Sequence, residues 1–417
     1  MMAGVGTVAH FGDDSNLEKA ASYSSLFANA LAQRFPDIQI SYSNHATGGT
    51  TTAGALPQLP LLVDGAGTET VPDLILIDYS TNDRFEQQDW NHNAARSKFA
   101  AEDNYAPVFA ATEALLRFLL HTYNDTALAM IGSYFEPNPK LSSASHAHAN
   151  ASALYGVLYV QPRAYGAEAP AGVLHPGAEV HKSFALALMN WWEATSESVV
   201  HCEENAPAAA TAAYSYSSSV HPFPEKPVAP LANKFHVCEK ALSTYSAAEA
   251  AVGKTGSSFL LPKDLRTGEE VGKDFNNGSS WNLALQRNRT DKAAWIAKTN
   301  GATLDFALEF GSAPRVAIVF MKGYNRSDFG NVVISMPSHK PKWDRFSLRG
   351  CCYKDKVTQS HVEVINAAQD IIQHSLETGV HGFGVKSYSR GVLRISFRKD
   401  GKKEPSQHFA IMHVSSC

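Results

Sequence analysis

Residues 73–83 have the sequence DLILIDYSTND, a short apolar run that follows Pro72 and ends in polar residues. A strand of about five apolar residues is typical of a parallel sheet, in which helices cover both faces. The polar residues after it, including Asn82 and Asp83, would then lie at the carboxyl edge of the sheet. Open α/β sheets bind their ligands at that edge, so this stretch predicts both a fold and the place of a site.

Helical and strand-like patterns alternate on both sides of this run. A Gly-rich stretch, ATGGTTTAG (residues 46–54), predicts a loop. Alternating strands and helices predict a doubly wound, flavodoxin-like parallel sheet with helices on both faces. The spacing of apolar residues predicts helices over residues 17–35, 106–123, 146–155 and 179–192, and strands over residues 38–42, 73–79, 127–135 and 156–160.

The composition changes near residue 200. Residues 201–233 are rich in Ala, Pro and Ser, which predicts a linker between an α/β domain over residues 1–200 and a second domain over residues 234–417. Strand-like runs separated by Gly, Asn and Ser predict that the second domain is mainly an antiparallel β-sandwich, with one added helix over residues 365–377. These runs are GATLDFALEF, RVAIVFMKGY, NVVISMP, HGFGVKSY, GVLRISFRK and HFAIMHV.

Composition excludes several classes of protein. The chain has 417 residues, of which 44% are hydrophobic and 18% charged, and a net charge of −4, so neither nucleic acid nor an anionic membrane surface is an expected partner. No apolar run is long enough to span a bilayer. The five cysteines lack zinc-ligand spacing, so we expect no metal and no cofactor. Cys202 and Cys238 flank the linker and form either a disulfide or two free thiols.

Five N-glycosylation sequons are present, and they predict a glycoprotein of the secretory pathway or the extracellular space. The first residues, MMAGVGTVAHFGDDS, have neither the basic nor the apolar region of a signal peptide. The sequons begin at Asn124, Asn150, Asn277, Asn288 and Asn325.

Three loops of the first domain carry the residues of interest. One follows the strand expected over residues 38–42, one follows the strand of residues 73–79, and one precedes the last helix. They are NHATGGTTT (residues 44–52), YSTND (residues 79–83) and VLHPGAEVH (residues 173–181).

With these three loops the sequence resembles the SGNH (GDSL-like) hydrolase family, in a branch with a C-terminal β domain that occurs in algae and protists. The resemblance implies that the backbone N–H of Gly49 and the side-chain amide of Asn82 bind an oxyanion. It makes His175 the general base and His181 a non-catalytic histidine. Such donors stabilise the charge that develops on an ester carbonyl under attack, and an imidazole can carry the proton of the nucleophile.

The chain departs from the family where the catalytic acid is expected. The family has an acid three residues before the histidine, but Gly172 occupies that position. The nearest acids in sequence are Glu168 and Glu179. Loss of the orienting acid lowers turnover by roughly 10⁴-fold in other triads, so we expect reduced activity.

The nucleophile has two possible locations. Ser15, in HFGDDS, follows a weak strand and carries one Asp more than the family pattern. The alternative, which we favour slightly, is that MMAGVG matches the residues after the serine, so that the serine would lie upstream of Met1. The sheet would then lack its usual central strand, unless residues 6–11 filled the gap.

The expected function is that of a serine-type ester hydrolase, a carbohydrate O-acetyl esterase whose substrate is a small ester or an acylated glycan. The alternative is a non-catalytic descendant, a glycan-binding or scaffold protein that keeps the fold as a pseudoenzyme. Four aromatic residues of the second domain could stack on sugars, although we favour the core for most of them. They are Trp281, Trp295, Tyr324 and Trp343.

Overall fold

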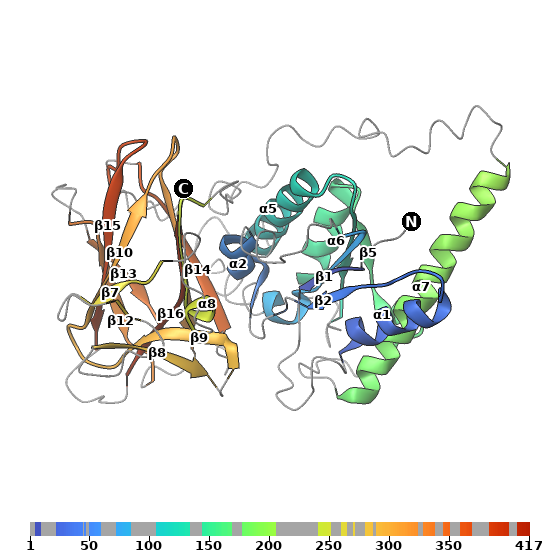
Figure 1. Cartoon of the computed structure of the whole chain (residues 1–417), viewed down its shortest axis with the longest axis horizontal. Coiled ribbons are helices and arrows are strands. Elements are labelled where there is room, and N and C mark those ends of the chain that lie inside the picture. The colour runs from blue at the N-terminus through green and yellow to red at the C-terminus, as the bar shows by residue number, and fades with distance from the viewer. Residues whose placement is uncertain are drawn as a thin grey trace, which may run out of the picture. The chain divides into compact units, whose positions relative to one another are not determined.

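The computed structural model groups into two compact units, shown in Figure 1. The first comprises Met1–Thr52 and Gly67–Ala232, and the second comprises Ala53–Ala66 and Asn233–Cys417. The chain thus contributes a short early segment to the second unit before it completes the first. The structure describes residues 5–9, 22–44, 46, 50–59, 72–84, 106–133, 144–168, 177–205, 241–251, 260–264, 270–271, 280–286, 289–323, 328–337, 345–350, 359–368, 383–399 and 407–417.

The first unit is built on a five-stranded parallel sheet with the order β2-β1-β3-β4-β5. Figure 1 shows α5 and α6 on one side of this sheet and α1 and α7 on the other, so the predicted doubly wound sheet is confirmed. The strands are β1 (Val5–Ala9), β2 (Tyr42–Asn44), β3 (Leu74–Ile77), β4 (Ala127–Ile131) and β5 (Leu158–Val160). The helices are α1 (Tyr23–Arg34), α2 (Thr52–Ala55), α5 (Ala106–Thr122), α6 (Ala144–Leu154) and α7 (Ala178–Asn205), with 3₁₀ turns η2 (Leu56–Gln58) and η3 (Pro162–Tyr165).

β3 is buried along its whole length, as its apolar sequence predicts. On one face, Leu74 and Leu76 pack in a core with Phe27 of α1 and Phe184 and Leu188 of α7. The apolar run therefore forms the strand that places the following polar residues at the carboxyl edge.

The centre of the sheet is occupied by residues near the start of the chain. β1 pairs in parallel with β2 on one side and with β3 on the other, through Val8↔Leu76 and Ala9↔Ile77. Residues 5–9 therefore occupy the position of the central strand, as the sequence allowed for residues 6–11. The physical reason is that the backbone N–H and C=O groups along the buried β3 require a partner on each side.

One predicted strand is displaced. Residues 38–42 were expected to be extended, but the N–H of Ile38 donates to the carbonyl of Phe35 at 3.0 Å and closes a turn after α1. β2 therefore begins only at Tyr42.

The second unit is a sandwich of two antiparallel sheets, as predicted. One sheet has the order β13-β12-β15-β10-β7 and the other the order β14-β11-β16-β9-β8, with β6 also paired to β16. Large apolar side chains from both sheets form its core, including Trp281 and Trp295. The elements are β6 (Ser243–Ser246), α8 (Ala247–Ala251), β7 (Lys263–Asp264), β8 (Trp281–Gln286), β9 (Arg289–Ala297), β10 (Thr303–Glu309), β11 (Arg315–Lys322), β12 (Asn331–Ser335), β13 (Arg345–Arg349), β14 (Gln359–Asn366), β15 (Arg390–Arg398) and β16 (Phe409–Ser416).

Two predicted elements of this unit differ from the structure. In the expected strand HGFGVKSY, the N–H groups of Phe383 and Val385 both donate to the carbonyl of Ala367, at 3.2 and 2.7 Å, so no strand ladder forms. The expected helix over residues 365–377 begins instead as the end of β14. Its residues after 368 lie outside the described part of the chain.

The early segment of the second unit covers β16. All eight residues of this strand are buried, and η2 contacts both β11 and β16. Phe409, Ile411 and Val414 belong to the sandwich core, whereas His413 lies beside the carbonyl of Pro57. β16 is therefore enclosed on both faces.

The burial of His413 predicts a dependence of stability on pH. Burial lowers the pKa of this imidazole to about 4, and the nearby Pro57 carbonyl offsets only part of that effect. In the unfolded chain, His413 therefore binds a proton below about pH 6.5, whereas in the folded unit it binds one only near pH 4. Stability is full above pH 6.5 and falls by about 3 kcal/mol as the pH drops to 4.

Chemical denaturation of the full chain at pH 7.5, 5.5 and 4.5 would measure this loss in the transition of the second unit. His413→Gln should show a clearly smaller difference between pH 7.5 and 4.5, while His121→Gln, which changes an exposed histidine, should match the unmodified chain. Identical pH profiles for His413→Gln and the unmodified chain would exclude this source of acid sensitivity.

Candidate functional site

A buried carboxylate, Asp78, directly follows β3 and organises the carboxyl edge of the sheet. Its Oδ2 accepts a hydrogen bond from the hydroxyl of Tyr23 at 2.9 Å, and its Oδ1 accepts from the hydroxyl and the N–H of Ser80 at 2.8 and 3.2 Å. Burial, and then the charge of Asp78, raise the pKa of Tyr23 well above its ordinary value. The phenol therefore keeps its proton and remains the donor of this bond.

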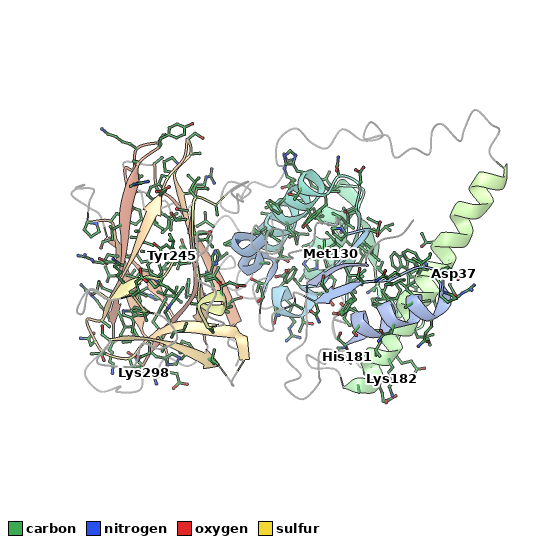
Figure 2. All side chains as sticks on the ribbon, in the orientation of Figure 1. Asp37, Met130, His181, Lys182, Tyr245 and Lys298 are labelled. Carbon is green, nitrogen blue, oxygen red and sulfur yellow. The ribbon has the colours of Figure 1, made fainter. Side chains whose placement is uncertain are left out.

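Tyr23 also reaches the last helix of the unit. Its backbone N–H donates to Nδ1 of His181 at 3.2 Å, and the two rings stack with centroids 5.9 Å apart. His181 and Lys182 lie in the first turns of α7, where Figure 2 labels them. Through Tyr23, the start of α7 is tied to the end of β3, and His181 has a structural part in that link.

Asn82 lies in a helical turn that starts directly after β3. The N–H groups of Asn82 and Asp83 both donate to the carbonyl of Tyr79, at 3.1 and 3.0 Å. The side-chain amide of Asn82 donates to the carbonyl of Thr50 at 3.0 Å. A primary amide has two N–H groups, and the second N–H of Asn82 has no partner among the described residues. The residue is buried, with 9% of its surface exposed.

Asp83, the next residue, holds the loop after β2. Its Oδ1 accepts from the N–H of Thr52 at 2.8 Å, and its Oδ2 is hydrogen-bonded to the hydroxyl of Thr52 and to Nε2 of His148, the latter at 2.7 Å. The Asp83 and His148 side chains are 2% and 0% exposed. One carboxylate therefore joins the loops or helices that follow β2, β3 and β4.

The proton of the His148 imidazole is placed by its surroundings. Nε2 faces a carboxylate, which only accepts, while Nδ1 is buried and has no partner within the described part of the chain. The hydrogen bond to this carboxylate therefore places a proton on Nε2. His148 thus donates from Nε2 to Asp83.

Sequence reasoning placed Asn82 at the carboxyl edge of the sheet, as observed, but did not single out the contacts of Thr52, Asp83 and His148. A signal was present in α6, because His148 belongs to the buried stripe of that helix together with Ala144, Ala147, Ala151 and Ser152. A histidine on a small-residue stripe needs a polar partner. Asp83, next to Asn82, was available as that partner.

The other site residues expected from the sequence are Ser15, Gly49 and His175, and all three lie outside the described residues, as does Gly172. The two acids nearest His175 in sequence face water. Glu168 is exposed, and Glu179 is exposed and paired with Lys182 at 2.7 Å.

Within the described residues, no three His, Cys, Asp or Glu side chains gather closely enough to hold a metal ion. No described helix has the length and apolar character needed to cross a membrane. Cys417 is disulfide-bonded, and the side chains of Cys202 and Cys238 lie outside the description. Trp281 and Trp295 are fully buried in the sandwich core and offer no surface to a sugar.

No family model and no curated protein matches this sequence. Among solved structures, a two-domain esterase (CEX) active on acetylated mannans matches over 99% of this chain and 90% of its own, with a TM-score of 0.56 and 13% identity. A single-residue variant of Axe2, an acetyl xylan esterase from Geobacillus stearothermophilus, matches 45% of this chain and 95% of its own, at TM-score 0.33 and 17% identity. A protein described as a GDSL-like lipase, from Parabacteroides merdae, matches 47% of this chain and 96% of its own, at TM-score 0.33 and 14% identity. The first likeness shows that this chain shares the fold of the two-domain esterase.

Proposed function

We propose that this chain is a serine-type ester hydrolase of the SGNH kind, of the branch with a C-terminal β domain, and that it removes acetyl groups from carbohydrate. The observation that carries the proposal is the arrangement of Asn82. This residue lies at the carboxyl edge of a parallel sheet and donates one amide N–H to Thr50, and its second amide N–H has no partner among the described residues. Asp83 holds the neighbouring loop at Thr52 in the same place.

In the proposed reaction, a serine hydroxyl adds to the ester carbonyl while His175 takes its proton. The proposed nucleophile within this sequence is Ser15. The carbonyl oxygen becomes an oxyanion that receives hydrogen bonds from Gly49 and Asn82. The oxyanion then collapses, the bond to the sugar oxygen breaks, and His175 returns the proton to that oxygen. Water repeats the sequence on the acyl-serine and releases acetate.

The substrate class is proposed by analogy with a protein of the same fold. The fold is shared with an esterase that acts on acetylated mannans, and fold likeness transfers function only as an analogy. An acetylated glycan would suit a protein of the secretory pathway, which the five sequons favour.

Removal of the Asn82 amide should lower the rate of the chemical step. The amide is expected to bind the oxyanion more strongly than the ground-state carbonyl, so Asn82→Ala should reduce kcat by about 10²–10³-fold with little change in KM. The measurement is the hydrolysis of p-nitrophenyl acetate and the release of acetate from acetylated mannan. Asn190→Ala is a matched control, because Asn190 donates its amide to a backbone carbonyl, that of Tyr165, at 3.0 Å on the surface.

Full kcat in Asn82→Ala would contradict the oxyanion role, and no rate above buffer with either ester would contradict the hydrolase proposal. The second outcome would favour the alternative, a non-catalytic glycan-binding or scaffold protein. One observation supports that alternative. Gly172 occupies the position of the expected acid, and Glu168 and Glu179, the acids nearest to His175 in sequence, are both exposed.

A further inference from the structure

The two sheets of the sandwich differ in what covers their outer faces. η2 contacts β11 and β16 of one sheet, whereas the sheet β13-β12-β15-β10-β7 exposes a charged outer face. Along β10 and β15, alternate residues such as Phe306 and Ile395 are buried in the core, and the residues between them are partly or fully exposed. The outward residues therefore form a continuous surface across the strands.

This outer face is basic although the chain as a whole has a net charge of −4. Among its described residues, five carry a positive charge and two carry a negative charge. Clefts and faces of one sign attract partners of the other sign. The basic residues are Lys263, Arg349, Arg390, Arg394 and Arg398, and the acidic ones are Asp305 and Glu309.

Both acids are already engaged in ion pairs. Arg394 donates two hydrogen bonds to Asp305, from Nε to Oδ1 at 2.9 Å and from Nη2 to Oδ2 at 2.8 Å. Arg390 pairs with Glu309 at 2.6 Å. The positive charge that remains uncompensated within the described face belongs to other residues.

Arg349 and Arg398 are basic residues of this face that lie outside the two ion pairs. Both are exposed, and the structure gives neither an acidic partner within its described residues. Asn331 of β12 is in register with Arg349 of β13 on one side and with Arg398 of β15 on the other. The two arginines are thus two strands apart, about 10 Å at the backbone, with an amide side chain between them.

Hydroxyl groups follow in the next row of the same face. Val333 is in register with Ser347 and Ser396, and Ser396 with Thr303, whose hydroxyls are 3.3 Å apart. This row has no aromatic side chain on which a base could stack. The face therefore offers guanidinium groups beside small hydroxyl groups.

We propose that this face, defined by Arg349, Asn331, Arg398, Ser347, Ser396 and Thr303, binds an anionic polysaccharide. Guanidinium groups bind sulfate or carboxylate groups through charge-assisted hydrogen bonds. The hydroxyl side chains of Ser347, Ser396 and Thr303 suit the hydroxyls of the sugar ring. The absence of aromatic side chains in the row disfavours single-stranded nucleic acid, whose bases stack on such side chains. The proposal is independent of the hydrolase activity.

Affinity electrophoresis of the full chain would test this binding. The gels would contain a sulfated glycosaminoglycan, polygalacturonate, neutral mannan or double-stranded DNA. We expect retardation by the sulfated glycan, the uronate glycan or both, which identifies the anionic group, and none by neutral mannan. Arg349→Gln/Arg398→Gln should weaken the binding by about tenfold or more, and added NaCl should weaken that of the unmodified chain.

Arg34→Gln/Lys182→Gln is the control for net charge, because it removes two exposed positive charges from the first unit. It should change the affinity less than about twofold if the face is specific. Three results would overturn the proposal: no retardation by either anionic glycan, equal binding by the Arg349/Arg398 double variant, or DNA binding of the same strength with the same dependence on these arginines. Unchanged hydrolysis in the double variant would keep this test separate from that of the proposed function.

Discussion

His175→Ala should lower kcat for p-nitrophenyl acetate by about 10²–10⁴-fold, the usual contribution of a general base. Without the imidazole, the serine hydroxyl must lose its proton to water, and the leaving oxygen has no positioned acid. The loss should lie toward the lower end of that range, because Gly172 cannot orient the ring as an acid would. Steady-state kinetics across pH 5–9 measure the effect, and the alkaline plateau of kcat should be lost.

The same experiment decides between the two candidate nucleophiles. If Ser15 attacks the ester, Ser15→Ala should match His175→Ala, and the double variant should be no slower than either, because the two groups act as one unit. If Ser15→Ala keeps the full rate while His175→Ala loses it, Ser15 is not the nucleophile. His121→Ala, which changes an exposed histidine, should keep the rate. An unchanged kcat in His175→Ala would remove the assigned base.

Asp83→Ala should destabilise the first unit by about 3–5 kcal/mol, because each buried donor that loses its acceptor costs about 1–3 kcal/mol. The substitution leaves three buried groups without an acceptor: the N–H and hydroxyl of Thr52 and the Nε2–H of His148. Because Asn82 and Thr52 would no longer be held together, kcat should also fall by about 10–10²-fold.

Two conservative variants separate these bonds. Thr52→Val keeps the shape and the N–H bond but removes the hydroxyl, so it should cost only about 1–2 kcal/mol. Asp83→Asn keeps an oxygen for the N–H of Thr52 and should lie between Asp83→Ala and the unmodified chain. Denaturant titration and kcat should rank the variants in the same order. A wild-type midpoint in Asp83→Ala would show that the Asp83–His148 bond contributes nothing to the unit.

The sequence predicted those features of the fold and the site that a few neighbouring residues determine. The apolar run of residues 73–79 predicted a buried strand and placed Asn82 at its carboxyl end, because a strand carries its neighbours to a known edge. The Asp83–His148 bond joins residues 65 positions apart, and no local pattern encodes such a contact. In HGFGVKSY the alternation was real, since Phe383 and Val385 are both buried. Burial alone does not determine which backbone groups pair, so the predicted strand did not form.

The assignment of Ala53–Ala66 to the second unit has a consequence for synthesis on the ribosome. This segment leaves the ribosome early, but β16, which it covers, is translated last. Leu56 and Leu59 are both buried in the folded protein. They therefore remain exposed on the nascent chain until translation is nearly over, and during that time they are sites for chaperone binding. In a fragment that starts at residue 233, η2 is absent, so the face of β16 that η2 covers would be exposed to water.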